Sequence, residues 1–338
     1  RFRVVLTVGG AVNLFSVLDQ AAARFGDRGA VYVGTQQLHT WAQLRDRAVR
    51  LAGSICAGHD TGARIAIASE NRPEIVELMF AIWASGCVVV PINFKLHPRE
   101  MAQILEDSGA SLVFASPKIA TGLEGFPVEV LGSPGYEARL DHSPVAPANP
   151  DPAALAWLFY TSGTTGRSKG AMLSHRNLIA MTVSHLADFD SPSEDSSLIH
   201  GAPMSHGSGL YIAPYVLRGA RQVIPASTGF DPDEFLDLCE HHPGTSCFLA
   251  PTMVQRLVAT GRAEHLGSAA RGRGAGAHRL RGCPRRPALA PGRRRPIGRD
   301  GHRQHRRHSG RASRSSRRPA ACRWSSAGPT PPATGWCP

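Results

Sequence analysis

Apolar and polar residues follow two different periods along the chain up to about residue 261. Apolar positions spaced near 3.6 residues predict helices at 13–26, 41–55, 73–86, 98–109, 175–189, 231–242 and 251–261. Short apolar runs rich in β-branched residues predict strands at 30–34, 64–69, 87–92, 111–116, 154–163, 196–203, 221–226 and 245–250. This alternation of strands and helices at short spacing predicts an α/β fold, with a mainly parallel sheet and helices packed on it.

Residues at the ends of the predicted helices support these boundaries. Thr40 stands where its hydroxyl can cap the helix at 41–55, and acidic residues open the helix at 231–242, where its dipole favours them. Pro73 fits the first turn of its helix and Gly86 fits the end. Between the two halves of the pattern, residues 121–150 are rich in proline and glycine, so we expect an irregular connector there.

Basic residues are concentrated at the end of the chain. Residues 268–338 hold 18 of the 38 basic residues, all arginine, with Asp300 as their one acid. This tail carries +17 and residues 1–267 carry −5, which together give the net +12. Because the tail has no Val, Phe or Met, it cannot bury enough apolar surface to offset the entropy of ordering. We therefore expect it to be disordered.

Two interpretations of this basic tail stay open. Arginine-rich segments are typical of binding to nucleic acid or to an anionic membrane. Alternatively, the tail was never selected as protein. Arg, Ala, Gly and Pro dominate it, all four use GC-rich codons, and lysine is absent. An out-of-frame reading of a GC-rich gene would produce such a change at about 267–270, and we favour this interpretation.

Cysteine usage and hydropathy indicate a reduced, cytoplasmic protein. The seven cysteines show no CxxC pair and no regular spacing, which supports neither a zinc site nor a disulfide framework. The first residues have no clear cleavage site, so no signal peptide is expected. The longest apolar stretch, at 78–92, is too short to span a bilayer. No Met opens the chain, which leaves its true N-terminus open.

The stretch YTSGTTGRSKG at 160–170 carries the strongest chemical signal. It differs from the common P-loop because its lysine follows a serine and precedes a glycine. Glycines free the backbone so that several N–H groups can face one anion, while hydroxyls and a lysine add donors. A loop after an apolar strand also lies at the sheet edge where α/β folds bind ligands. The candidate phosphate-binding residues are Thr161, Ser162, Gly163, Thr164, Thr165, Gly166 and Lys169. The alternative is a flexible surface linker, which would need neither a lysine nor flanking apolar runs.

The longer stretch YTSGTTGRSKGAMLSHRNL resembles the signature of the adenylate-forming (AMP-binding) family of acyl-CoA synthetases, luciferases and peptide-synthetase adenylation domains. The family's usual form has Pro where this chain has Ser168. Segments 38–55, 80–116 and 200–210 also resemble family motifs, in the family's order. The resemblance implies the large N-terminal domain of such an enzyme, incomplete, with parallel-rich sheets and packed helices.

The resemblance further implies a two-step reaction with ATP, Mg²⁺ and coenzyme A. A carboxylate attacks the α-phosphorus of ATP to give acyl-adenylate and pyrophosphate, and the CoA thiol then takes the acyl group. The loop at 160–170 would grip the β/γ-phosphates, and His206 would line the acyl pocket or orient the carboxylate. A fatty acid is the first expectation, because HGAPMSHGSGL at 200–210 looks more like acyl-CoA ligases than peptide-synthetase domains. Aryl acids stay open.

Other parts that the resemblance implies have no candidate in the tail. Family members carry a Thr-Glu pair for adenine and Mg²⁺, a ribose-binding Asp, and a C-terminal domain with a lysine that supports adenylation. Residues 268–338 contain neither Glu nor Lys, and Asp300 resembles the ribose-binding position only superficially. We therefore expect a partial domain at 1–267, a low-complexity tail at 268–338, and little or no turnover. The alternatives are an inert remnant of such a ligase and a basic-tail nucleic-acid-binding protein.

The remaining conspicuous side chains are expected to be structural. His175 stands at the start of a helix, and His241 and His242 lie beside Cys239 at a helix end without a third metal ligand. The aromatic residues expected in the core are Trp83, Phe94, Tyr211 and Phe248.

The DNA around codon 268 tests the frameshift interpretation. If one base was lost or gained there, resequencing or reading the other two frames will restore an apolar, mixed-charge sequence. An intact in-frame join with no such alternative frame would contradict it.

Overall fold

The computed structural model describes residues 13–161 and 168–262. The chain divides into two compact units, Arg1–Pro284 and Arg285–Pro338, and every described residue belongs to the first. The predicted disorder of the tail at 268–338 therefore lies outside the described residues.

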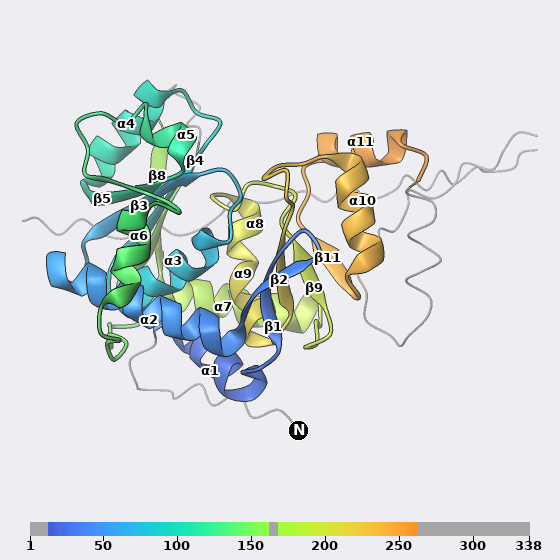
Figure 1. Cartoon of the computed structure of the whole chain (residues 1–338), viewed down its shortest axis with the longest axis horizontal. Coiled ribbons are helices and arrows are strands. Elements are labelled where there is room, and N and C mark those ends of the chain that lie inside the picture. The colour runs from blue at the N-terminus through green and yellow to red at the C-terminus, as the bar shows by residue number, and fades with distance from the viewer. Residues whose placement is uncertain (1–12, 162–167, 263–338) are drawn as a thin grey trace, which may run out of the picture. The chain divides into compact units, whose positions relative to one another are not determined.

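The described residues form two β-sheets with helices on their faces (Figure 1). The six-stranded sheet has the order β6-β5-β3-β4-β7-β8, and the five-stranded sheet has the order β11-β9-β10-β1-β2. Neighbouring strands are parallel in both sheets, apart from the antiparallel pairs β7–β8 and β1–β2. The predicted parallel-rich α/β class is confirmed, but the strands divide between two sheets.

The elements have the following bounds. The strands are β1 (Gly29–Val33), β2 (Gln36–Thr40), β3 (Arg64–Ser69), β4 (Val88–Asn93), β5 (Ala110–Ala115), β6 (Val128–Val130), β7 (Leu155–Thr161), β8 (Lys169–Ser174), β9 (Ser197–Ile199), β10 (Arg221–Ile224) and β11 (Thr245–Cys247). The helices are α1 (Ser16–Phe25), α2 (Trp41–Gly58), α3 (Glu74–Ala84), α4 (Pro98–Ser108), α5 (Pro117–Ala120), α6 (Pro134–Ala138), the 3-10 helix η1 (Arg139–Asp141), α7 (His175–Asp188), α8 (Gly207–Leu210), α9 (Ile212–Leu217), α10 (Pro232–His241) and α11 (Pro251–Ala259).

Side chains alternate between the two faces of each strand, and this places the apolar residues of one strand in two different cores. On β3, Ile65 and Ile67 join the largest core, whereas Ala66 and Ala68 on the other face join the core under α4. The largest core is built on α1, α2 and α3 and also takes in Val31 of β1 and Ile224 of β10. Helices α2 and α3 thus share one core with both sheets.

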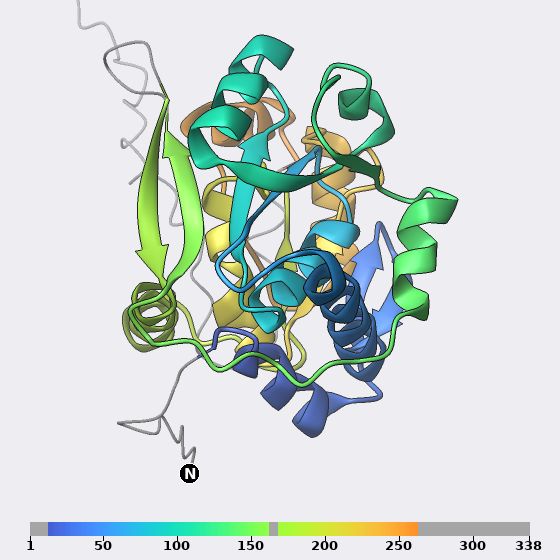
Figure 2. The same ribbon diagram turned by 90° about the vertical axis from the view of Figure 1, so that its left-hand side faces the viewer.

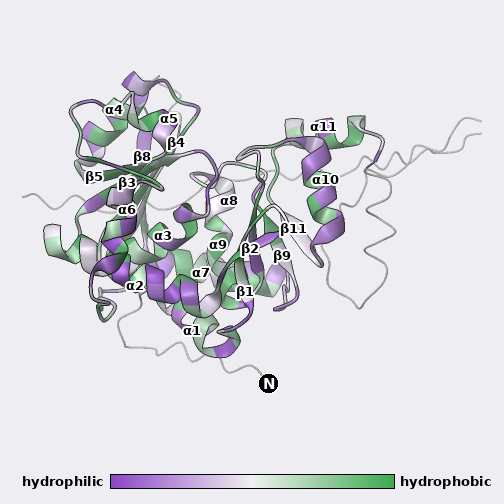
Figure 3. Ribbon diagram, viewed as in Figure 1, coloured by the Kyte–Doolittle hydropathy of each residue, from purple (hydrophilic) through white to green (hydrophobic). Residues whose placement is uncertain are grey.

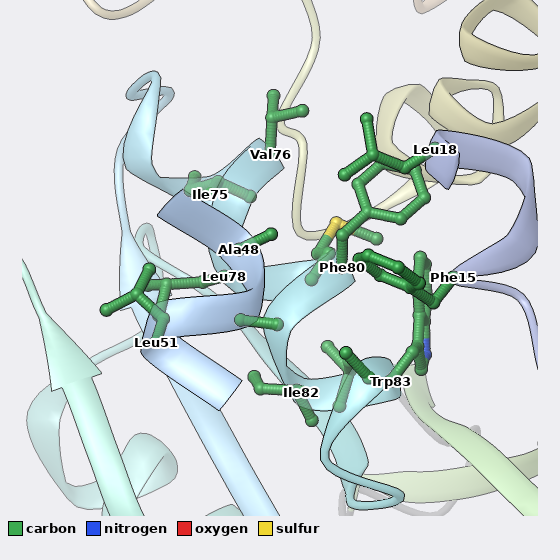
Figure 4. Packing of buried hydrophobic residues seen from close by; sticks show 14 of the residues in the cluster. Phe15, Leu18, Ala48, Leu51, Ile75, Val76, Leu78, Phe80, Ile82 and Trp83 are labelled. Atoms are coloured by element: carbon green, nitrogen blue, oxygen red, sulfur yellow. The ribbon is translucent and has the colours of Figure 1, made fainter. Parts of the chain in front are cut away.

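Helix α3 is the most deeply buried element of this core. All ten residues from Ile75 to Ala84 are buried, as expected for a helix that is apolar on nearly every side. Phe80 and Trp83 face Phe15 and Leu18 of the α1 segment, and Leu78 lies beside Leu51 of α2 (Figure 4). The outer helices are more polar, as the purple residues along α2 and α10 show (Figure 3). No helix in the described part of the chain has the length and apolar character needed to cross a membrane.

One charged residue of α3 is buried with its partners. Glu77 is 1% exposed and accepts hydrogen bonds from Arg47 Nε at 2.5 Å, Arg47 Nη2 at 3.0 Å and Tyr136 Oη at 2.5 Å. Burial, followed by the nearby Glu77 carboxylate, raises the pKa of Tyr136 well above its usual value. Because both carboxylate oxygens are paired, the charge is tolerated in the interior.

The caps and most predicted elements are confirmed within a few residues. Thr40 forms a capping box with Gln43 at the start of α2, and Asp231 caps α10. The connector predicted at 121–150 is irregular only in part, because it contains β6, α6 and η1. Tyr136 of α6 docks on Glu77, and β6 pairs with β5, so long-range contacts create order that the local composition does not indicate.

Replacing Glu77 tests this buried pair. We expect Glu77→Ala to lower the free energy of unfolding by about 3–5 kcal/mol, because Arg47 would keep a half-buried charge with only the exposed Glu137 carboxylate left, 3.8 Å from Nη1, and Tyr136 Oη would lose its buried acceptor. Asp19→Ala is the matched control: it removes the exposed ion pair with Arg45, also on α2, and should cost less than about 1 kcal/mol. Urea unfolding of both variants measures the difference, and equal losses would contradict the assignment.

Candidate functional site

The predicted phosphate loop joins the two strands of an antiparallel hairpin. Thr161, the last residue of β7, is the register partner of Lys169, the first residue of β8. The hairpin stands at one side of the described fold with α7 at its lower end (Figure 2). Of the seven candidate residues, Thr161 and Lys169 are described and both are exposed, whereas Ser162, Gly163, Thr164, Thr165 and Gly166 lie outside the described residues.

Strand β8 is absent from the sequence-based prediction, which placed no strand between the loop and the helix at 175. β8 is an edge strand whose residues are all exposed or half-buried, Met172 being 71% exposed, so its sequence needs few apolar side chains. Its six residues, KGAMLS, therefore show no clear strand pattern. Pairing with β7 fixes it, and a Cβ at position 170 would meet the ring of Tyr160 at 3.0 Å. The hairpin therefore sets the spacing between the two ends of the loop.

His206 lies next to this hairpin in space. Its ring stacks on Phe159 of β7, with ring centroids 4.7 Å apart and planes 16° from parallel. Phe159 and Thr161 point to the same face of β7, because side chains alternate along a strand. The structure thus brings His206 to the strand that leads into the predicted phosphate loop.

His200, at the start of the same segment, is fully buried and lies in a hydrogen-bonded chain. Gln222 Nε2 donates to the Ala220 carbonyl, which directs Gln222 Oε1 toward His200 Nε2 at 3.1 Å. Nε2 is therefore the donor, and Nδ1 accepts from Ser208 Oγ at 2.8 Å. Burial lowers the pKa of His200 to about 4, so the ring is neutral at pH 7.

Small residues and aromatic rings lie close together around His206. A Cβ at Gly209 would lie 1.9 Å from the Met204 carbonyl oxygen, so this position requires glycine, and a Cβ at Gly207 would lie 2.4 Å from the ring of Phe248, which would have to move. Phe248 also contacts Tyr211, with ring centroids 5.6 Å apart. The prediction of Phe248 as a core residue is wrong: it is 38% exposed, whereas Trp83 is buried as predicted.

The other histidines named from the sequence have structural contacts. His175 is 1% exposed, accepts a hydrogen bond from the Leu14 amide at Nδ1, and has its pKa lowered to about 4 by burial. His242 Nε2 lies 2.9 Å from the Gly34 carbonyl oxygen. Within residues 13–161 and 168–262, no group of three or more His, Cys, Asp or Glu side chains could hold a metal ion.

Two polar residues of this region were missed by the sequence analysis. Asn71 and His200 are both buried. Asn71 comes two residues after the end of β3, and His200 directly follows β9. Polar residues at the carboxyl end of a strand are a signal that could have identified them.

Comparison with known proteins gives consistent matches. A family model described as "AMP-binding enzyme" matches residues 18–289, past the composition change at 267–270, so the domain boundary at 267 stays a prediction. A feruloyl-CoA synthase of an Amycolatopsis species is 36% identical over 65% of this chain and 45% of its own length. A long-chain-fatty-acid–CoA ligase of Thermus thermophilus is 29% identical over 72% of this chain and 48% of its own length.

The fold also matches solved structures. The crystal structure of ATP-bound MatB from Rhodopseudomonas palustris aligns with a TM-score of 0.67 at 29% identity, over 77% of this chain and 53% of that chain. The chain therefore spans about half the length of the curated and solved relatives that it matches.

The buried histidines predict a stability loss in mild acid. The folded-state pKa values of His175 and His200 lie near 4, below about 6.5 for an unfolded histidine, so the unfolded chain binds more protons between these values. Stability is full above pH 6.5 and falls as the pH drops toward 4, by about 2 kcal/mol per histidine at pH 5. Urea unfolding at pH 7.5 and pH 5 measures this loss.

Variants separate these two histidines from other acid-sensitive groups. His175→Gln and His200→Gln should each lose less stability than the unchanged chain on going from pH 7.5 to pH 5. His142→Gln replaces an exposed histidine and should keep the original loss. If all three variants keep it, neither buried ring is responsible.

Proposed function

Because the chain belongs to the AMP-binding enzyme family, we propose that it carries the ATP- and acid-binding part of an ATP-dependent acyl-CoA ligase. Such an enzyme joins a carboxylic acid to AMP with release of pyrophosphate, and then transfers the acyl group to the thiol of coenzyme A. The family resemblance seen in the sequence is confirmed. The roles of individual residues, the acid and the activity are proposals.

The observation that carries the proposal is the stacking of His206 on Phe159. Phe159 stands two residues before Thr161, at the entrance of the proposed phosphate loop, and two residues of a strand span roughly 7 Å. An acid bound at His206 and a triphosphate bound at the loop would therefore lie within the length of one nucleotide. This proximity suits attack of a carboxylate on the α-phosphorus.

The described residues could perform two tasks in this reaction. Lys169 is exposed at the end of the hairpin, where its ammonium could neutralise a β- or γ-phosphate oxygen, and Thr161 offers a hydroxyl donor. His206 could orient the carboxylate from the same side of β7. Mg²⁺ bound to the phosphates of ATP would lower their negative charge, and positioning would supply much of the remaining catalysis.

A fatty acid is the first candidate for the acyl group, as the 200–210 segment suggests, and one relative acts on long-chain fatty acids by name. An aryl acid is the second candidate. Phe159, Tyr211 and Phe248 offer ring faces near His206, and another relative is a feruloyl-CoA synthase by name. Both candidates are apolar acids.

We place the reaction in the cytoplasm, where ATP and coenzyme A are available.

The 338-residue chain itself is expected to bind ATP but to show little or no turnover. Its tail offers no Glu or Lys for the later parts of the reaction. The inert remnant and the basic-tail nucleic-acid binder are the competing functions, and binding measurements separate all three.

ATP titration by calorimetry tests the phosphate site. Lys169→Ala should weaken ATP binding roughly tenfold to a hundredfold, because it removes a charge-assisted contact. Lys118→Ala, which removes an exposed lysine of α5 at the other side of the same sheet, should leave ATP binding unchanged. Repeating the titration with octanoate and with ferulate measures which acid binds and whether ATP strengthens it.

The outcomes distinguish the functions. Loss of ATP binding in Lys169→Ala alone supports the ligase site, whereas equal effects of both lysine variants would contradict it. No ATP binding by the unchanged chain would favour the inert remnant. Affinity for duplex DNA that falls steeply with salt and follows the tail onto another protein would favour the nucleic-acid binder.

A further inference from the structure

Asn71 lies just beyond the carboxyl end of β3 and is 2% exposed. Its side-chain amide is fully engaged by the segment that leads to His206. Nδ2 donates to the carbonyl oxygens of His200 at 2.7 Å and Ala202 at 2.9 Å, and Oδ1 accepts from the Met204 amide at 2.8 Å. One side chain thus fixes three backbone groups between residues 200 and 204.

The backbone of Asn71 makes a further link to the five-stranded sheet. Its amide donates to the Thr228 carbonyl at 3.2 Å, in the loop that follows β10. Thr228 has a φ of +59°, a conformation that a β-branched residue rarely adopts without support. Asn71 therefore joins the carboxyl end of β3 in one sheet to the loops after β9 and β10 in the other.

The segment that carries His206 is anchored on both sides. Asn71 holds Met204, and His200 holds Ser208. Around these points, the His206 amide donates to the Pro203 carbonyl and the Gly209 amide donates to the His206 carbonyl, each at 3.0 Å. His206 therefore has little freedom to leave Phe159 while both anchors are in place.

The chemistry of this site selects asparagine. It needs two donors and one acceptor on one short planar group, which the Asn amide provides. An aspartate would present a carboxylate to the carbonyl oxygens of His200 and Ala202, and an apolar side chain would leave buried backbone groups unpaired.

We propose that Asn71 is a positioning residue that holds His206 in its stacked orientation and thereby sets where the carboxylate of the acid binds. It acts through the 200–208 segment and touches no reacting atom. The proposal rests on the function proposed for His206, and its structural part can be tested apart from that function.

Asn13 offers a matched control for Asn71. It is also buried, its Nδ2 donates to the Trp83 carbonyl at 2.7 Å and the Ala148 carbonyl at 2.9 Å, and its Oδ1 accepts from the Phe15 amide at 2.9 Å. The hydrogen-bond pattern is the same, but the bonds tie the start of α1 to the end of α3. Loss of these bonds should destabilise the fold without moving His206.

The experiment compares the full chain with its Asn71→Asp and Asn13→Asp variants, each with ¹³C-labelled histidine. The His206 ring signals, assigned with His206→Gln, should lie upfield in the unchanged chain because the ring stacks on Phe159. Asn71→Asp should move them toward the values of a free imidazole and weaken octanoate or ferulate binding roughly tenfold to a hundredfold. Asn13→Asp should change neither, although urea unfolding should show both variants to be destabilised.

Each outcome bears on a different claim. Equal His206 shifts in the two variants, or none in Asn71→Asp, would overturn the positioning role. If the unchanged chain binds neither acid while only Asn71→Asp moves the His206 signals, the positioning role stands and the proposed acid site fails. If Asn71→Asp does not fold, Asn71→Ser, which keeps one donor and one acceptor, is compared with Asn13→Ser by the same shift.

Discussion

The burial of helix α3 in the core that α1, α2 and residues of both sheets share is the constraint on which the rest of the structure depends. Every residue from Ile75 to Ala84 is buried, because α3 packs on β3 and β4 on one side and on α2 on the other. The interior position also explains why Glu77 is tied to both Arg47 and Tyr136, which draws the 134–141 region onto the core. A segment that looks like a connector is ordered for this reason.

The same packing determines where the candidate site forms. The turn that carries Asn71 connects β3 to α3, so the position of α3 fixes the position of Asn71. Asn71 in turn holds the 200–204 segment, and His206 reaches Phe159 on β7. The loops at the carboxyl ends of strands from both sheets are thereby joined, at the edge where open α/β sheets bind ligands.

Some features were predictable because their physical cause is local. Helical spacing, the Thr40 cap and the Asp231 cap depend on neighbours within one or two turns, and the structure has them where the pattern indicates. Short and edge strands were missed. The three residues of β6 and the exposed strand β8 carry almost no periodic signal, and only their partners β5 and β7 make them strands. Phe248 was misjudged because an aromatic residue in a loop can equally well lie at the surface, beside Gly207.

The sequence by itself determined the family, through several motif segments in the family's order, and it identified the stretch at 160–170 as the candidate phosphate loop from its glycine, hydroxyl and lysine positions. It also identified His206 as a candidate through the motif around it. Only the tertiary structure decided that the strands form two sheets and that His206 stacks on Phe159. It also decided that Asn71 holds the 200–204 segment that leads to His206. The reason is distance along the chain: Asn71 and Met204 are 133 residues apart, and no local pattern specifies which buried amide will meet which loop.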